Sequence, residues 1–227
     1  MYDILAIILT PVTWPMSWLL SVYGQMLGSM GLAIVCLSIT FNVLMLPLSR
    51  KAQAAERRAA KNAAFVREQI RARRGNLKGE ALFDLTEKIY TENGFHPIQT
   101  VMTGAGLMVM LPVLISSIIV ITDNPLVDGV GFLFIKDLGQ PDQLLSLGAL
   151  EINILPLLMF AISLADAFWR YRGSTPDVVK FSVISLVLLF LVYGLASGLV
   201  LYWITSNAFA AVVAAVGRHR RHVDLPT

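Results

Sequence analysis

Residues 31–53 read GLAIVCLSITFNVLMLPLSRKAQ, and this stretch decides the class of fold. Residues 31–49 carry no charged side chain, and Arg50 and Lys51 follow directly. An uncharged helix of this length, at about 1.5 Å per residue, nearly matches the ~30 Å thickness of the hydrocarbon core of a bilayer. The stretch therefore predicts a membrane-spanning helix that emerges into a basic segment.

The rest of the chain repeats this segregation of apolar and charged residues. Of its 227 residues, 56% are hydrophobic and 15% are charged, whereas about 25% are charged in ordinary globular proteins. Charged residues are absent from residues 4–49, 93–122, 152–165 and 181–217. This excludes a soluble domain and predicts an all-α membrane protein, because a helix satisfies its own backbone hydrogen bonds in lipid. The single cysteine, Cys36, excludes a disulfide framework within the chain.

The basic residues predict the orientation in the membrane. Of 18 lysines and arginines, 11 lie in residues 50–92, three in 170–180 and three in 218–221. The remaining one, Lys136, lies in residues 123–151 together with five acidic residues. Because loops rich in lysine and arginine stay in the cytoplasm, we expect the three basic segments to be cytoplasmic and the 123–151 loop to be exterior.

Five transmembrane helices, with the amino end outside and the carboxyl end inside, would connect these segments. We expect them at residues 28–49, 97–122, 152–169, 180–195 and 197–217. The last two share one uncharged window, which we interpret as a tight hairpin that turns at Gly194 to Gly198. A single kinked helix would instead place the basic carboxyl end outside, against the charge rule.

Residues 4–25 are apolar but contain Pro11 and Pro15, with Trp14 and Trp18 interleaved. Tryptophan favours the headgroup level of a membrane. We expect a helix that lies in the outer interface, and a sixth span is the alternative.

Residues 50–92 predict a cytoplasmic helical hairpin. Residues 50–74 and 80–92 are rich in good helix formers, and 75–79 read GNLKG, which is a turn signal. The charged surface of this hairpin is a solvated face in one interpretation. In the other it contacts lipid headgroups or ribosomal RNA phosphates.

Two stretches resemble the YidC-type membrane protein insertase family. Residues 31–53 are similar to the first core span of that family, and residues 198–207, GLVLYWITSN, are similar to its last. Between them, the charged hairpin, the entry NGFHP into the second span at 93–97 and Leu155-Pro156 at the third follow the order of the family. The similarity extends over about residues 1–220 and is to the compact form, which has no large periplasmic domain.

The resemblance implies a single insertase-like domain, a five-helix bundle around a hydrophilic groove that is open to cytoplasm and lipid and closed to the outside. Such a protein guides small membrane proteins from the cytoplasm into the bilayer and acts as their chaperone. The resemblance implies nascent membrane proteins and the lipid bilayer as partners, with the ribosome and the general translocon as further candidates. It implies a multi-pass protein of the bacterial cytoplasmic (inner) membrane, with no cofactor and no small-molecule substrate.

The candidate residues for contact with a client protein are Asn42, Thr40, Ser38, Asp166, Ser163, Trp203 and Asn207. Asn42 stands five residues before Pro47, where the family typically has an arginine, and about 12 Å below the cytoplasmic surface at helical rise. An interhelical hydrogen bond is the alternative role for Asn42, and an i, i+4 pair with Arg170 is the alternative for Asp166. The hydroxyl and amide side chains are more often packing residues in membrane helices, and Trp203 fits an aromatic belt.

The sequence contains no motif of conventional catalysis. His96, His219 and His222 lack the spacing of metal ligands, and no phosphate-binding loop of the Walker type occurs. We therefore expect a protein that is not an enzyme. A membrane assembly partner that does not insert proteins is a second hypothesis, supported by Asn42 in place of arginine. A small transporter is a third, disfavoured because we find neither an internal repeat nor a charged residue at the midplane.

Overall fold

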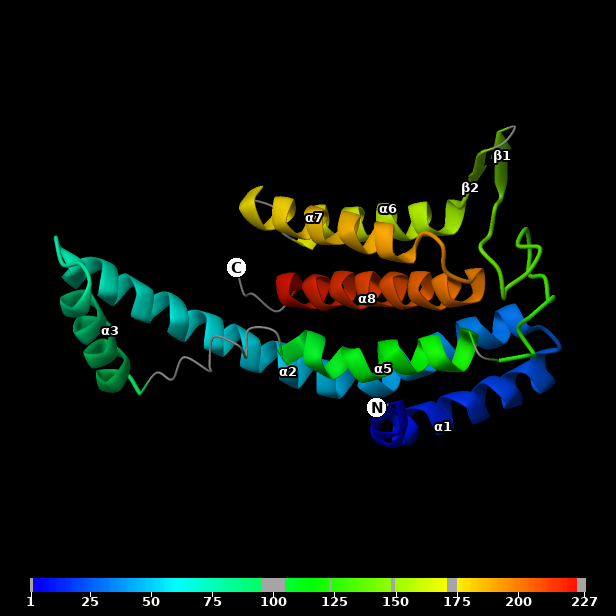
Figure 1. Cartoon of the computed structure of the whole chain (residues 1–227), viewed down its shortest axis with the longest axis horizontal. Coiled ribbons are helices and arrows are strands. Elements are labelled where there is room, and N and C mark those ends of the chain that lie inside the picture. Colours follow the sequence, from blue (N-terminus) through cyan, green and yellow to red (C-terminus); the bar gives the residue numbers. More distant parts are fainter. Residues whose placement is uncertain (1, 95–104, 123, 148–149, 171–174, 224–227) are drawn as a thin grey trace. The chain divides into compact units, whose positions relative to one another are not determined.

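The described part of the chain is predominantly helical in a computed structural model (Figure 1), which confirms the helical fold class expected from the sequence. The structure describes residues 2–94, 105–122, 124–147, 150–170 and 175–223. It divides into two compact units, Met1–Leu44 with Leu114–Thr227 and Met45–Val113.

The helices of the first unit follow the uncharged windows of the sequence. They are α1 (Tyr2–Leu27), the first part of α2 (Met30–Arg74), the last part of α5 (Ala105–Thr122), α6 (Ile154–Arg170), α7 (Thr175–Val192) and α8 (Ser197–Val223). The expected helix at 4–25 is present as α1, and residues 97–104 of the expected second span lie outside the described residues.

The last uncharged window forms two helices, as expected. Helix α7 ends at Val192 and α8 begins at Ser197, with the backbone N–H of Leu195 bonded to the carbonyl of Val192 at 3.0 Å. Helix α7 starts at Thr175 rather than at residue 180, so this arm is longer than the expected 16 residues by two, at 18. The amino-terminal extension is possible because Thr175-Pro176 supplies a favourable helix start, with proline in the first turn.

Two helical segments among the described residues are long and apolar enough to cross a membrane, one in Met30–Arg74 and the other at Ser197–Val216. Shorter apolar helices cover Met110–Thr122, Ile154–Trp169 and Val178–Val192. The number of spans and their direction stay predictions.

Within the first unit, α8 lies between the α6–α7 pair and the parts of α2 and α5 that belong to this unit, residues 30–44 and 114–122 (Figure 1). Its first two turns are buried, with Leu199 and Val200 packed in the core together with Ile34 and Leu37 of α2. Further along, side chains of α8 become half-buried, and Ala210 is exposed. The first unit is therefore tightly packed at the end where α8 begins and more open toward the other end.

The segment between α5 and α6 is folded against the tightly packed end. The backbone N–H of Ser197 donates to the carbonyl of Gln140, and that of Gly198 to the carbonyl of Leu138, both at 2.8 Å. The Asp142 carboxylate accepts the N–H of Ile154 at 2.6 Å, which caps the start of α6. These contacts attach the 124–144 loop to the first residues of two helices.

The same segment contains two short strands that the sequence did not predict. They are β1 (Leu145–Leu147) and β2 (Leu150–Ile152), and they pair antiparallel with Leu145 opposite Ile152, Ser146 opposite Glu151 and Leu147 opposite Leu150. Strands of three residues are too short to produce a readable alternation of apolar and polar residues.

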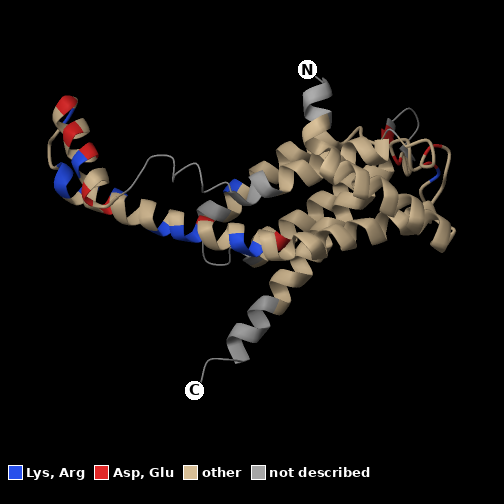
Figure 2. Cartoon of the chain, turned by 90° about the horizontal axis from the view of Figure 1, so that it is seen from below, with Lys and Arg blue, Asp and Glu red and all other residues tan. Residues whose placement is uncertain are grey.

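The second unit contains the expected helical hairpin, formed by the last part of α2 and by α3 (Glu80–Glu92). A small cluster of Ala63, Val66 and Ile89 joins the two arms. Arg73 and Glu92 form an exposed ion pair at 3.1 Å, which contributes little to stability. Figure 2 shows that most charged residues of the described part of the chain belong to this hairpin and to the loop after α5.

Helix α2 is continuous from the first unit into the second. Pro47 lies inside it, close to the boundary between the units at Leu44 and Met45. A proline has no backbone N–H to donate to the carbonyl of the residue four positions earlier, so one hydrogen bond of the helix is missing at this point.

Gly31 gives a direct test of the packed end. A Cβ atom on Gly31 would overlap the ring of Phe132, whereas one on Gly24 would meet only the flexible end of Met30, with the nearest atom at 3.1 Å. We expect Gly31→Ala to lower the free energy of unfolding by about 1–3 kcal/mol through overpacking. Gly24→Ala should be neutral or stabilising, because alanine favours a helix. Denaturant titration of both variants in detergent measures this, and equal stabilities would contradict the contact.

Candidate functional site

Polar side chains of α8 bond to three different helices within an apolar bundle. Ser206 pairs with Asn42 of α2, with the Asn42 amide nitrogen 2.9 Å and its amide oxygen 3.1 Å from the serine hydroxyl. Trp203 donates its indole N–H to the Ser117 hydroxyl of α5 at 3.2 Å. Asn207 donates to the Ser163 hydroxyl of α6 at 3.3 Å. Helix α8 is therefore the polar centre of the first unit.

Asn42 also donates to the carbonyl of Ser38 at 2.8 Å, so both ends of its amide are engaged. Ser38 is fully buried and donates to the carbonyl of Tyr202 on α8 at 2.8 Å. Both residues thus join α2 to α8, which matches the interhelical alternative considered for Asn42.

Thr40 lies on another side of α2. Its hydroxyl is 2.9 Å from the hydroxyl of Tyr23, which belongs to α1. This pair joins α1 to α2, and the structure does not bring Thr40 together with Asn42 in one polar group.

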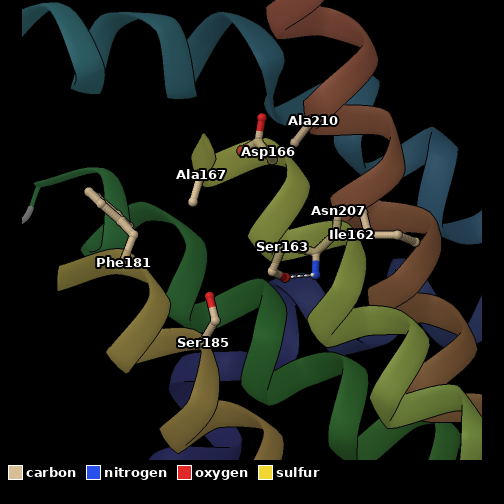
Figure 3. A pocket seen from close by; sticks show the side chains of 8 residues that line it. All are labelled: Ile162, Ser163, Asp166, Ala167, Phe181, Ser185, Asn207 and Ala210. Carbon is tan, nitrogen blue, oxygen red and sulfur yellow. Dashed lines mark hydrogen bonds between the residues drawn. The ribbon is translucent and has the colours of Figure 1, made fainter. Parts of the chain in front are cut away.

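A pocket of about 210 Å³ lies among α6, α7 and α8. Its lining residues are Ile162, Ser163, Asp166, Ala167, Phe181, Ser185, Asn207 and Ala210. Figure 3 shows the Asn207 amide and the Ser163 hydroxyl facing each other, with Ser185 on the opposite wall. The Ser163 hydroxyl itself donates to the carbonyl of Met159 at 2.9 Å. The pocket therefore combines an apolar frame with hydroxyl, amide and carboxylate groups.

The structure distributes the seven candidate residues over separate places. Ser163, Asp166 and Asn207 line the pocket. Ser38 and Asn42 lie at the contact of α2 with α8, and Trp203 lies at the contact of α8 with α5. Thr40 lies at the contact of α1 with α2. Contact of any of the seven with a client stays a prediction.

Several polar residues of these contacts and of the pocket were not among the candidates, namely Ser117, the partner of Trp203, Tyr23, the partner of Thr40, and two further serines. Ser206, the partner of Asn42, looked like an ordinary packing residue in the sequence, and Ser185 lies in an apolar run of α7. Ser185 is the only polar residue in the run 183–192, and a lone hydroxyl in an apolar helix is the signal that could have assigned it to a polar contact within the bundle. Nothing in the sequence pairs Ser206 with Asn42, because the two are 164 residues apart.

The acidic residues do not gather into a cation site within the part of the chain that the structure describes. No group of three or more histidine, cysteine, aspartate or glutamate side chains there could hold a metal ion. The pocket and the contacts of α8 can therefore offer hydrogen bonds to polar groups at a position that is surrounded by apolar helices.

Comparison with known proteins identifies the family that this chain resembles. Residues 22–222 match the family model described as 60Kd inner membrane protein. The chain is 26% identical over 191 residues to the membrane protein insertase YidC of Endomicrobium trichonymphae, covering 80% of this chain and 34% of that protein. It is 27% identical over 233 residues to the membrane protein insertase YidC of Rhizobium etli (strain CIAT 652), covering 94% of this chain and 37% of that protein. The chain thus spans about a third of the length of these two relatives.

A crystal structure of an active YidC insertase with its first transmembrane domain resolved has a similar fold. The TM-score is 0.56, with 90% of this chain and 46% of that chain covered at 21% sequence identity. The likeness agrees with the helical architecture described above.

The pair of Asn42 and Ser206 predicts an energetic coupling between α2 and α8. In a double-mutant cycle, Asn42→Ala and Ser206→Ala should couple by about 1 kcal/mol, the usual size for a hydrogen bond between membrane helices. Thr205→Ala is the control, because the Thr205 hydroxyl bonds to the carbonyl of Leu201 in its own helix at 2.9 Å. Unfolding in detergent measures the cycle, and simple additivity for both pairs would contradict the contact.

Proposed function

The chain belongs to the 60Kd inner membrane protein family, that of the YidC-type insertases, and we propose that it is itself a membrane protein insertase and chaperone. It would guide small membrane proteins from the cytoplasm into the lipid bilayer. The activity, the clients and the partners are all part of this proposal and are not taken over from the relatives, because the chain spans only about a third of the length of the first relatives.

The observation that carries the proposal is a polar pocket behind apolar helices. Ser163, Asp166 and Asn207 present polar groups to the pocket among α6, α7 and α8. Helix α7, which forms one wall, exposes large apolar side chains on its other faces, including Phe190 at 87% and Leu191 at 68%. Such a wall suits contact with lipid, while the pocket suits polar segments of a client.

The mechanism follows from desolvation. Moving a polar backbone or side chain from water into hydrocarbon without a hydrogen-bond partner costs several kcal/mol. Hydroxyl and amide groups in the inner half of the membrane lower that cost for the polar segment of a client. Burial of the client's apolar helix in lipid then supplies the driving free energy. No covalent chemistry is needed, in keeping with a protein that is not a conventional enzyme.

We propose a multi-pass topology in the bacterial cytoplasmic (inner) membrane. Helices α2, α5, α6, α7 and α8 supply the five spans, with the amino end outside and the carboxyl end inside. Helix α1 lies in the outer interface, the 123–151 loop is exterior, and the 50–92 hairpin is cytoplasmic. The charge distribution supports this orientation, since 17 of the 18 basic residues fall on the cytoplasmic side.

The candidate residues have different roles in this proposal. Ser163, Asp166 and Asn207 contact the client in the pocket. Asn42, Ser38 and Trp203 line the deeper part of the groove when α8 and its neighbours separate. Thr40, which bonds to Tyr23 of α1, contacts the client only when α1 also moves away from α2. The basic hairpin is the site at which nascent chains, the ribosome or the general translocon would approach.

An assembly partner that stabilises membrane proteins without inserting them is the second candidate function. Asn42, where the family typically has an arginine, favours it, because its amide is fully engaged with Ser38 and Ser206. The two functions differ in whether the purified chain alone inserts a client.

Filling the pocket tests insertion directly. We expect Ser185→Leu to reduce the insertion of a small single-span client into reconstituted vesicles several-fold, because leucine occupies the polar pocket. Ser182→Leu is the matched control, since Ser182 is a partly buried serine of the same helix that does not line the pocket. Protease protection of the client measures insertion. Equal activity of both variants would remove the pocket from the client path, and no insertion by the native chain would favour the assembly partner.

Cysteine labelling tests the topology. In a Cys36→Ser background, Gln140→Cys should react with a membrane-impermeant reagent in intact cells, because the 123–151 loop is exterior. Lys78→Cys in the hairpin should react only after lysis. Protection of position 140 in intact cells with labelling after lysis would overturn the five-span model.

A further inference from the structure

The loop after α5 carries an exposed apolar turn at residues 132–135. The backbone N–H groups of Phe132 and Ile135 each donate to the carbonyl of the other at 2.9 Å. The two residues at the apex point outward, Leu133 with 82% and Phe134 with 61% of their surface exposed. Leu133 has φ of 53°, a left-handed conformation that is unfavourable for a branched side chain. The backbone thus keeps two large apolar side chains exposed in spite of strain.

This exposure does not come from a loose loop. Val127, Ile135 and Leu138, on either side of the apex, are 0–3% exposed. The Asp137 carboxylate accepts the N–H groups of Gly129 at 2.9 Å and Gly139 at 2.8 Å. The turn is therefore a fixed feature of the first unit, and it presents the same two side chains persistently.

Contacts with two long apolar helices set the depth of the turn. The ring of Phe132 lies on Gly31, the second residue of α2. Leu138, three residues after the turn, accepts the N–H of Gly198, the second residue of α8. Each helix contains an uncharged run of 20 residues, 30–49 in α2 and Ser197–Val216 in α8, which extends over about 30 Å. If both helices span the bilayer, both of these helix starts, and the turn with them, lie at its outer boundary.

We propose that the 132–135 turn is a lipid anchor, with Leu133 and Phe134 inserted into the outer leaflet and Lys136 directed to the phosphate groups. This rests on the membrane topology proposed above. Lipid is the occupant because the turn lies at the level where apolar helices leave the hydrocarbon, and because an exposed lysine follows it directly. Apolar and aromatic side chains beside a lysine are the usual composition of interfacial anchors.

Such an anchor fixes the depth of the closed end of the first unit. The turn contacts the start of α2, and the adjoining residues bond to the start of α8. Insertion of Leu133 and Phe134 therefore holds both helix starts at the outer boundary, while the more open end of the unit remains able to separate.

Depth-dependent fluorescence quenching tests the anchor. Three single-cysteine variants are made in a Cys36→Ser background, Phe134→Cys, Glu151→Cys and Leu44→Cys, and each is labelled with an NBD fluorophore. All three positions are exposed. The proteins are reconstituted into phosphatidylethanolamine and phosphatidylglycerol vesicles with doxyl groups placed at shallow or deep positions on the acyl chains.

We expect the label at 134 to emit at shorter wavelength than the label at 151 and to be quenched by the shallow doxyl group. The label at 151, which replaces a carboxylate of the same segment, should stay water-like and unquenched. The label at 44 should be quenched most by the deep doxyl group, because it lies on the apolar part of α2. Quenching at 134 and 44 but not at 151 supports the anchor.

The other outcomes are distinguishable. A water-like, unquenched label at 134 with normal quenching at 44 overturns the anchor and leaves the membrane topology intact. Absence of quenching at 44 overturns the spanning position of α2, and the anchor with it. If the label at 134 is shielded in native membranes but water-like in pure lipid vesicles, the turn binds a protein and the lipid anchor is wrong.

Discussion

The bundle depends on one requirement, that polar side chains in an apolar environment must find their partners within the protein. Lipid offers no hydrogen bonds, so an unsatisfied polar group there costs several kcal/mol. Helix α8 meets the requirement at three residues, which bond to different neighbours, Trp203 to α5, Ser206 to α2 and Asn207 to α6. The buried hydroxyls of Tyr202 on α8 and Ser116 on α5 are exceptions, because neither has a hydrogen-bond partner among the described residues. The three bonds fix the rotation of α8 relative to three helices at once, and apolar packing alone would leave that rotation less well defined.

The elements of the fold could be predicted because charge and hydropathy are local properties. The uncharged windows predicted α6 and α8, with a turn at Gly194 to Gly198 where the structure has its break at 193–196. Helix formers and the turn signal at 75–79 predicted the hairpin of α2 and α3. The structure places α1 where proline and tryptophan were interleaved, although the sequence leaves open whether it lies on the membrane or spans it. Strands β1 and β2 were not predicted, because three residues are too few to show the alternation of apolar and polar side chains that marks a strand.

The candidate site was less predictable because it depends on pairs distant in sequence. Depth along a helix is readable, and Asn42, Ser163 and Asn207, which were selected as client contacts, are partly buried polar residues in apolar runs. Their contact with a client stays a prediction. The partner that each polar residue contacts depends on how two helices are rotated relative to each other. A single sequence does not contain that rotation. Asn42 was expected in a groove, and the structure pairs it with Ser206. Whether the bond between Asn42 and Ser206 breaks to admit a client depends on the free energy of separating the two helices, which the sequence pattern does not give.

The continuity of α2 has a mechanical consequence. One unbroken helix runs from the bundle into the basic hairpin, so α2 is one of the two stretches of chain, with α5, that can transmit a force from the hairpin to the bundle. Pro47 removes a hydrogen bond from α2 within one turn of the boundary between the units. The helix is therefore most compliant in bending at this point but still stiff in extension, because the covalent chain and the remaining bonds carry tension. We expect sideways movement of the hairpin to bend α2 near Pro47, whereas a pull along the axis of α2 would load the residues before Pro47, among them Asn42 with its bond to Ser206.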